Sequence, residues 1–223
     1  MNELLFLLHI CMVMGFGVMA LKMGRGALTA WIALQAVLAN LFVIKQICFF
    51  NLHVTGSDVF AIGTVFGLNL LREYFGKEAA AKGLQACFFA MVFFVLMAQI
   101  HLFYLPSPYD TTHSAFLTVL SPSWRLLFAS IAAFFIVQQI ELRLFGYLKT
   151  KFRSIPLAAR NAVSTVSTQF LDTFLFSLLG LWGMVASLSD IILMSFLIKV
   201  TVIALMTPLM LFSKRFIGAH DPA

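Results

Sequence analysis

The chain has 223 residues, of which 61% are hydrophobic and only 11% are charged, with a formal net charge of +6 and a mean hydropathy of +0.98. Roughly a quarter of the residues of a typical soluble domain are charged, so this chain lacks the polar surface that a water-soluble fold needs. The composition therefore excludes a soluble globular domain and predicts an integral membrane protein.

Seven apolar segments follow one another along the chain, each close to the ~20 residues that a helix needs to cross the hydrocarbon core. Their approximate limits are 4–21, 27–50, 57–75, 84–105, 116–141, 160–183 and 190–212. The segments lack the strict alternation of membrane-barrel strands. We therefore expect an all-α polytopic bundle of seven membrane helices, six plus an extra N-terminal one, in a single domain over residues 1–223.

The first segment has the length of a helix but could also be a cleaved signal peptide. Its N-terminal end, MNELL, contains Glu3 and neither Lys nor Arg, whereas Lys22 and Arg25 come after the apolar run. A signal peptide carries its positive charges before the apolar core. We therefore expect this segment to remain in the protein as a membrane helix.

Basic residues alternate between the two ends of the predicted helices. They follow the first, third, fifth and seventh segments, whereas the connections near 51–56, 106–115 and 184–189 contain none. By the positive-inside rule, the N-terminus lies outside and the C-terminus in the cytoplasm of a multi-pass protein of the cytoplasmic (inner) membrane. Topology thus explains the pI of about 9.5, and no nucleic-acid partner is expected.

Asp172 lies in the middle of the apolar run 160–181. A carboxylate near the centre of a bilayer costs several kcal/mol, so such residues by default mark a functional site. Asn161, Thr165, Thr168 and Asp172 are spaced i, i+4, i+7 and i+11, which places them along one stripe of a helix. One side of this helix is therefore expected to meet polar groups.

Three basic residues lie inside predicted spans. Lys45 and Arg125 are near the expected outer ends of their helices, where snorkelling to the headgroups explains them as well as a functional role does. Lys199 lies deep in the last segment. It can form a structural ion pair with Asp172, take part in transport, or do both.

Amide side chains occur in three further spans, as Asn40, Asn69 and the pair Gln138 and Gln139. Amides in a membrane need hydrogen-bond partners, which are more often neighbouring helices than a ligand. Together with the 25 phenylalanines available to stack on a flat ring, these groups suit the site of a small polar organic molecule, such as a purine-like base.

No motif indicates an enzyme, a metal site or a cofactor. Cys11, Cys48 and Cys87 lie apart in apolar runs without a CxxC pair, which predicts neither a disulfide framework nor metal binding. The sequence contains no GxSG-type nucleophile, no HExxH and no paired acidic motif at metal-binding spacing, so a membrane-embedded enzyme is the least favoured alternative.

Four stretches, in their order and spacing, resemble the queuosine precursor transporters, also described as a vitamin-uptake-like transporter family. They are ANLFVIK (39–45), LNLLREYFGK (68–77), WRLLFASIAAFFIVQQIE (124–141) and RNAVSTVSTQFLDTFLF (160–176), followed by Lys199 in the last segment. The resemblance spans about residues 30 to 212. It departs from the family pattern in the extra N-terminal helix and at Asn69, where the family usually has Asp, which puts in doubt an identical substrate or identical proton coupling.

The resemblance implies import of 7-deazaguanine bases, namely the cyano and aminomethyl precursors or queuine, for salvage into tRNA modification. The expected substrate-binding residues are Asp172, Asn69, Gln138, Gln139, Asn40, Arg125, Lys199 and Thr168. Asp172 would bind the amidine-like edge of the base, and amides would recognise its other polar atoms. The expected partners are this small molecule and membrane lipid.

One alternative is a substrate-binding membrane subunit of an energy-coupling uptake system for another small polar or purine-like vitamin. Such a subunit needs a separate ATPase module, because this chain contains no GxxxxGK[ST] motif. Small-residue patches at Gly15–Gly17 and Gly63–Gly67 could pack helices within one protomer or between protomers. A homo-oligomer is therefore a further expectation to test.

Overall fold

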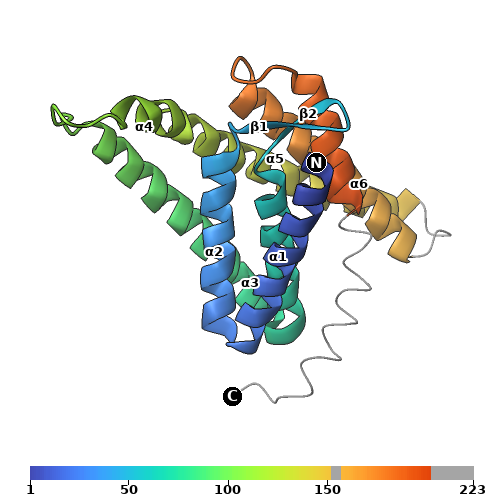
Figure 1. Ribbon diagram of the computed structural model, residues 1–223. Helices are drawn as coiled ribbons and strands as arrows, with labels where there is room; N and C mark the ends of the chain where they lie inside the picture. Colours follow the sequence, from blue (N-terminus) through green and yellow to red (C-terminus); the bar gives the residue numbers. More distant parts are fainter. Residues whose placement is uncertain (152–156, 202–223) are drawn as a thin grey trace.

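The computed structural model describes residues 1–151 and 157–201 of the chain (Figure 1). Its elements are α1 (Asn2–Lys22), α2 (Arg25–Phe42), β1 (Gln46–Phe49), β2 (Leu52–Thr55), α3 (Asp58–Leu102), α4 (His113–Leu120), α5 (Ser123–Lys151), α6 (Leu157–Phe176) and a π-helical turn, η1 (Ser177–Leu181). A further helix covers residues 188–201, and we call it the C-terminal helix. Apart from two short strands, the described elements are helical, which confirms the expected fold class.

Four helical stretches among the described residues are long and apolar enough to cross a membrane. They are Asn2–Lys22, Arg25–Phe42, Asp58–Leu102 and His113–Val137. Large apolar side chains are exposed on the outer faces of these helices, for example Leu4 at 72% and Phe89 at 74%. Lipid rather than water suits such surfaces, so the chain is a multi-pass membrane protein.

Small residues allow α1, α2 and the first part of α3 to pack closely. A side-chain carbon added at Gly67 would lie 2.4 Å from Ile32, and one added at Gly63 would lie 2.7 Å from Val13. The helix backbones approach each other here because these glycines have no side chain. The patch Gly63–Gly67 therefore packs helices within one protomer, and the main apolar core lies between these three helices.

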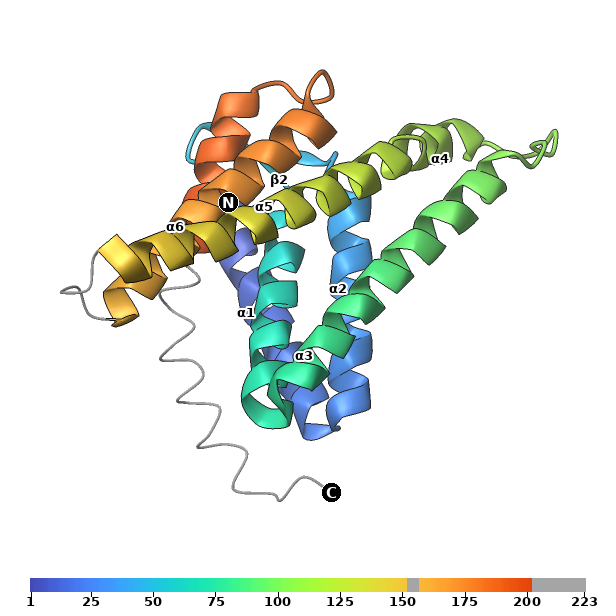
Figure 2. The ribbon, with the colours of Figure 1, turned by 180° about the vertical axis from the view of Figure 1, so that it is seen from behind.

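Gly76 divides α3 into two arms. Its φ of 85° and ψ of 174° are not helical, and only glycine adopts a positive φ of this kind without strain. Figures 1 and 2 show the second arm turning back from this point and running away from α1 and α2. The expected spans 57–75 and 84–105 correspond to the two arms, and Gly76 ends the first as the family resemblance implies.

The second expected span, 27–50, is wrong beyond Phe42. After Phe42 the chain turns at Lys45 and forms a hairpin in which β1 pairs antiparallel with β2, with Gln46 opposite Thr55. Phe50 and Asn51 form its turn with positive φ angles of 48° and 62°. A short apolar run such as Ile47–Phe50 fits a helix or a strand equally well by periodicity, and here the pairing with the next segment decides.

Contacts with two other segments fix the hairpin at one end of the bundle. Asn2 Nδ2 donates to the Cys48 carbonyl at 2.8 Å, and the Ala186 N–H donates to Gln46 Oε1 at 2.9 Å. The hairpin therefore joins the start of α1 to the loop that precedes the C-terminal helix (Figure 1). Under the expected topology, this is the outer end of the protein.

The fifth expected span, 116–141, is interrupted rather than continuous. The helix α4 ends at Leu120 and α5 begins at Ser123, one residue after Pro122. Gln99 Nε2 holds this break by donating to the Leu120 carbonyl at 3.0 Å and to Ser123 Oγ at 3.1 Å. α5 then runs on to Lys151, as expected, and packs along α6 (Figure 2).

The last two expected spans are described only in part. The sixth, 160–183, corresponds to α6 and η1, which end at Leu181. The seventh, 190–212, begins as the C-terminal helix at residue 188. Its remainder, 202–212, lies outside the described residues, so the total of seven spans stays a prediction.

Candidate functional site

A cavity of about 390 Å³ lies between α2, both arms of α3, α5, α6 and the C-terminal helix. Its size falls in the range of roughly 300–1,000 Å³ that small-molecule sites occupy. Its lining is mostly apolar with a minority of polar groups. The polar side chains that line it are Asn40, Thr55, Ser57, Asp58, Thr64, Ser130, Gln169, Asp172, Thr173, Ser177, Ser195 and Lys199.

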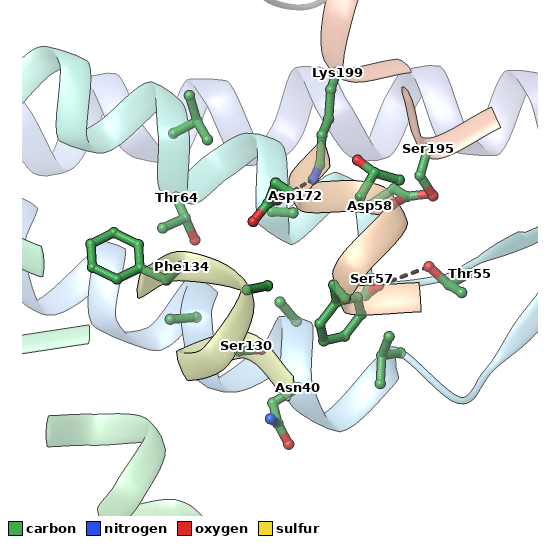
Figure 3. A pocket seen from close by; sticks show the side chains of 18 of the residues that line it. Asn40, Thr55, Ser57, Asp58, Thr64, Ser130, Phe134, Asp172, Ser195 and Lys199 are labelled. Carbon is green, nitrogen blue, oxygen red and sulfur yellow. Dashed lines mark hydrogen bonds and ion pairs between the residues drawn. The ribbon is translucent and has the colours of Figure 1, made fainter. Parts of the chain in front are cut away.

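The cavity contains an ion pair between α6 and the C-terminal helix. Lys199 Nζ lies 2.9 Å from Asp172 Oδ2, and the two side chains are 19% and 33% exposed (Figure 3). The ion pair expected from the sequence is therefore confirmed. Each charge compensates the other away from bulk water, which explains how both groups lie inside an apolar bundle.

A second carboxylate, Asp58, lines the same cavity. It is the first residue of α3, is 7% exposed, and accepts a hydrogen bond from Ser195 Oγ at 2.9 Å. Ser195 and Lys199 are four residues apart on one helix, so they share a face. Sequence reasoning missed Asp58 as a site residue, although the i, i+4 spacing of Ser195 and Lys199 was a usable signal.

Asn40 contributes a buried hydrogen-bond acceptor to the cavity wall. The residue is 7% exposed, and its Oδ1 atom has no hydrogen-bond partner among the described residues. A buried acceptor without a partner costs about 1–3 kcal/mol. A ligand with an N–H or O–H group in the cavity would remove this cost, which makes Asn40 a candidate recognition residue.

Three phenylalanines form much of the apolar lining. Phe88 from the second arm of α3 and Phe134 from α5 pack edge to face with ring centroids 5.1 Å apart, and Phe176 lies at the end of α6. Aromatic rings stack favourably on other flat rings. The cavity therefore combines flat apolar walls with carboxylate, ammonium and amide groups.

The polar face of α6 is rotated relative to the expected stripe. Gln169, Asp172, Thr173 and Ser177 line the cavity, whereas Thr168 is buried outside it. The side chains of Asn161 and Thr165, which completed the expected stripe, lie outside the described residues. Gln169 is a cavity residue that the sequence did not single out, although it is three residues before Asp172.

Arg125 supports the site without lining the cavity. Its Nε atom donates to the Leu179 carbonyl at 3.0 Å, and its Nη2 atom donates to the Trp182 carbonyl at 2.8 Å. Both carbonyls belong to the end of η1 or the residue after it, where helical carbonyls lack partners. Arg125 therefore fixes the C-terminal end of the α6–η1 segment, rather than only snorkelling to the membrane surface.

The expected site residues thus divide into groups by position. Asp172, Lys199 and Asn40 are brought together at the cavity, and Arg125 braces its wall. Asn69, Gln139 and Thr168 are not among the residues that line it, and the side chain of Gln138 lies outside the described residues. No group of three or more metal-ligating side chains occurs within residues 1–151 and 157–201.

Comparisons with known proteins place this geometry in context. Residues 55–213 match the model of a family described as "Putative vitamin uptake transporter". A curated protein of Bacillus subtilis (strain 168), named "Probable queuosine precursor transporter", is 27% identical over 215 residues, which cover 95% of this chain and 91% of the relative. No solved structure matches the chain. The family match includes Asp58, Asp172 and Lys199, whereas Asn40 precedes it.

Proposed function

The chain belongs to the vitamin uptake transporter family, and we propose that it imports queuosine precursors, as the name of its Bacillus subtilis relative indicates. The proposed substrates are the 7-deazaguanine bases that cells salvage for tRNA modification. The base crosses the membrane unchanged, so no catalytic step is involved. The purified chain is proposed to act without an ATPase module.

The observation that carries this proposal is the Asp172–Lys199 ion pair inside the cavity of about 390 Å³. A carboxylate can accept two N–H bonds from the amidine-like edge of a guanine-type base. In the empty site Lys199 compensates the charge of Asp172, and the bound base supplies replacement hydrogen bonds. The pair therefore prepares an ionised acceptor in a region that lipid surrounds.

The remaining groups of the cavity complement the rest of such a base. Asn40 offers its unpartnered oxygen to a further N–H group, and Phe88, Phe134 and Phe176 offer faces and edges to the flat ring. Transport would proceed by rocking of helices around this site, so that it opens first to one side and then to the other. The hairpin at the expected outer end would have to move with them.

The direct test measures queuosine in tRNA in a host that lacks its own precursor synthesis and importer. Each candidate base is supplied at low concentration, with the chain, with Asp172→Asn, or with Asp190→Asn as a charge-matched control outside the cavity. We expect the chain and the control variant to restore queuosine and Asp172→Asn to fail at equal membrane abundance. Normal uptake by Asp172→Asn would refute the assigned role of Asp172.

Reconstitution separates the two kinds of uptake system. The purified chain alone in proteoliposomes should accumulate or equilibrate the base. Uptake that appears only after an ATPase module is added would favour a substrate-binding subunit instead.

A further inference from the structure

The cavity has more negative than positive charge. Among the described residues that line it, the charged side chains are Asp58, Asp172 and Lys199, and the other titratable group is the Cys87 thiol. Lys199 forms its ion pair with Asp172. Asp58 therefore lies in the cavity with a hydroxyl partner, Ser195, and without a cation within ion-pair distance in the described part of the chain.

The surroundings of Asp58 favour its ionised form. The residue occupies the first turn of α3, where the helix N-terminus carries a partial positive charge and stabilises a carboxylate. The Ser195 hydroxyl donates to the carboxylate, and hydrogen bonds to a charged form also stabilise it. Asp58 is thus a standing anion in the cavity rather than a neutral acid that waits for a proton.

A second acceptor without a partner lies in the same cavity. Asn40 is buried and its Oδ1 atom accepts no hydrogen bond within the described chain. An alkylammonium group has three donors and no acceptor, which suits a site with an ionised carboxylate and an empty amide oxygen. An uncharged ligand would leave the buried charge of Asp58 uncompensated, which is costly in a water-poor interior.

The cavity is long enough to separate this charge from the flat ring. Figure 3 shows Asp58 with Ser195 on one side of the cavity and Phe134 on the other, with Asp172 between them. A base held by Asp172 and the phenylalanines would therefore direct a short side arm toward Asp58. Ser57 and Thr55 line the cavity next to Asp58 and hydrogen bond to each other at 2.8 Å.

We infer that Asp58 binds a positively charged arm of the substrate, so that the cavity selects a base with an alkylammonium substituent over an uncharged base of similar size. This inference rests on the proposed function and adds the charge of the substrate to it. Asp58 is then a specificity-determining residue, whereas Asp172 recognises the ring.

The first experiment compares two deazaguanine bases with the unmodified protein in proteoliposomes. One base carries an aminomethyl group, which is cationic at neutral pH, and the other a cyano group, which is neutral. We expect the initial uptake rate at limiting concentration to be at least tenfold higher for the aminomethyl base. Equal rates, or a faster rate for the cyano base, would overturn the inference.

The second experiment measures the ratio of the two uptake rates in Asp58→Asn. Removing the carboxylate should lower the aminomethyl-to-cyano ratio at least tenfold. Asp190→Asn makes the same chemical change outside the cavity and should keep the original ratio. If Asp58→Asn reduces uptake of both bases in the same proportion, Asp58 does not bind the arm.

The two arms also distinguish this inference from other outcomes. Sodium or proton entry that accompanies the cyano base and disappears in Asp58→Asn would place an inorganic cation at Asp58, and would overturn the inference. Uptake of both bases at equal rates would refute only the inference and leave the proposed function standing. Uptake of neither base by the unmodified protein would refute the proposed function itself. If Asp58→Asn does not reach the membrane, the comparison with the unmodified protein still decides.

Discussion

Ser195 and Lys199 lie four residues apart on the C-terminal helix, and each holds a carboxylate from a different helix. Ser195 Oγ donates to Asp58 of α3 at 2.9 Å, and Lys199 Nζ donates to Asp172 of α6 at 2.9 Å. A rotation or shift of the C-terminal helix would therefore change both contacts together. This arrangement links the two carboxylates of the cavity through one movable element.

Removing one member of the Asp172–Lys199 pair should affect stability and uptake differently from removing both. Asp172→Asn leaves the Lys199 charge uncompensated, and we expect it to destabilise the protein by about 1–2 kcal/mol, which is below the 3–5 kcal/mol of a fully buried pair. The lower figure follows from the partial exposure of both side chains. Thermal unfolding in detergent measures the loss.

The double variant Asp172→Asn with Lys199→Met provides the control for this pair. It removes both charges, so most of the lost stability should return, whereas uptake should remain at least a hundredfold below that of the unmodified chain. Recovery of uptake in the double variant would mean that the pair is structural only.

Asn40 should contribute to uptake without contributing to stability. Because its Oδ1 atom is buried and unpartnered, Asn40→Ala removes an unsatisfied acceptor, and stability should change by less than about 1 kcal/mol. Uptake should nevertheless fall at least tenfold. Gln35→Met is the matched control, since Gln35 Oε1 is also buried and unpartnered in the described chain but does not line the cavity. Equal effects of the two variants on uptake would contradict a ligand role for Asn40.

Arg125 should act on the site through the backbone that it holds. Its two donors bind the Leu179 and Trp182 carbonyls, and hydrogen bonds of charged groups contribute about 1.5–3 kcal/mol each. Arg125→Leu should therefore lower stability by about 2 kcal/mol and reduce uptake, mainly by raising KM. Arg125→Lys should recover only part of this, because an ammonium cannot reproduce the planar fork.

The exposed Arg143 on the same helix supplies the comparison for Arg125. Arg143→Leu should leave both the melting temperature and KM within error. A loss of the same size in the two leucine variants would show that α5 needs the positive charge in general rather than the contacts of Arg125.

Close packing at Gly67 predicts a large effect of a single methyl group. A side-chain carbon at Gly67 would lie 2.4 Å from Ile32 and 2.9 Å from Trp31, and overpacking of this kind costs about 1–3 kcal/mol. Gly67→Ala should lower the melting temperature accordingly, and Ile32→Ala should partly rescue it. Gly15→Ala meets no atom within 4 Å and should be neutral or slightly stabilising.

The sequence alone determined the class of the protein, most helix positions and the central ion pair. Hydropathy places apolar helices in lipid segment by segment, because each helix satisfies its own backbone hydrogen bonds. The cost of a charge in the bilayer marks Asp172 and Lys199 individually, and their opposite signs predict that they pair. These effects depend on neighbouring residues along one helix, so a sequence displays them.

Only the tertiary structure decided the hairpin, the role of Asp58 and the orientation of α6. The run Ile47–Phe50 is compatible with either helix or strand until Leu52–Thr55 pairs with it. Asp58 reads as an ordinary first residue of a helix until Ser195 approaches from 137 positions away. The rotation of α6 turns Gln169 rather than Thr168 toward the cavity. Each outcome depends on contacts between distant segments, whose energies local composition and periodicity do not contain.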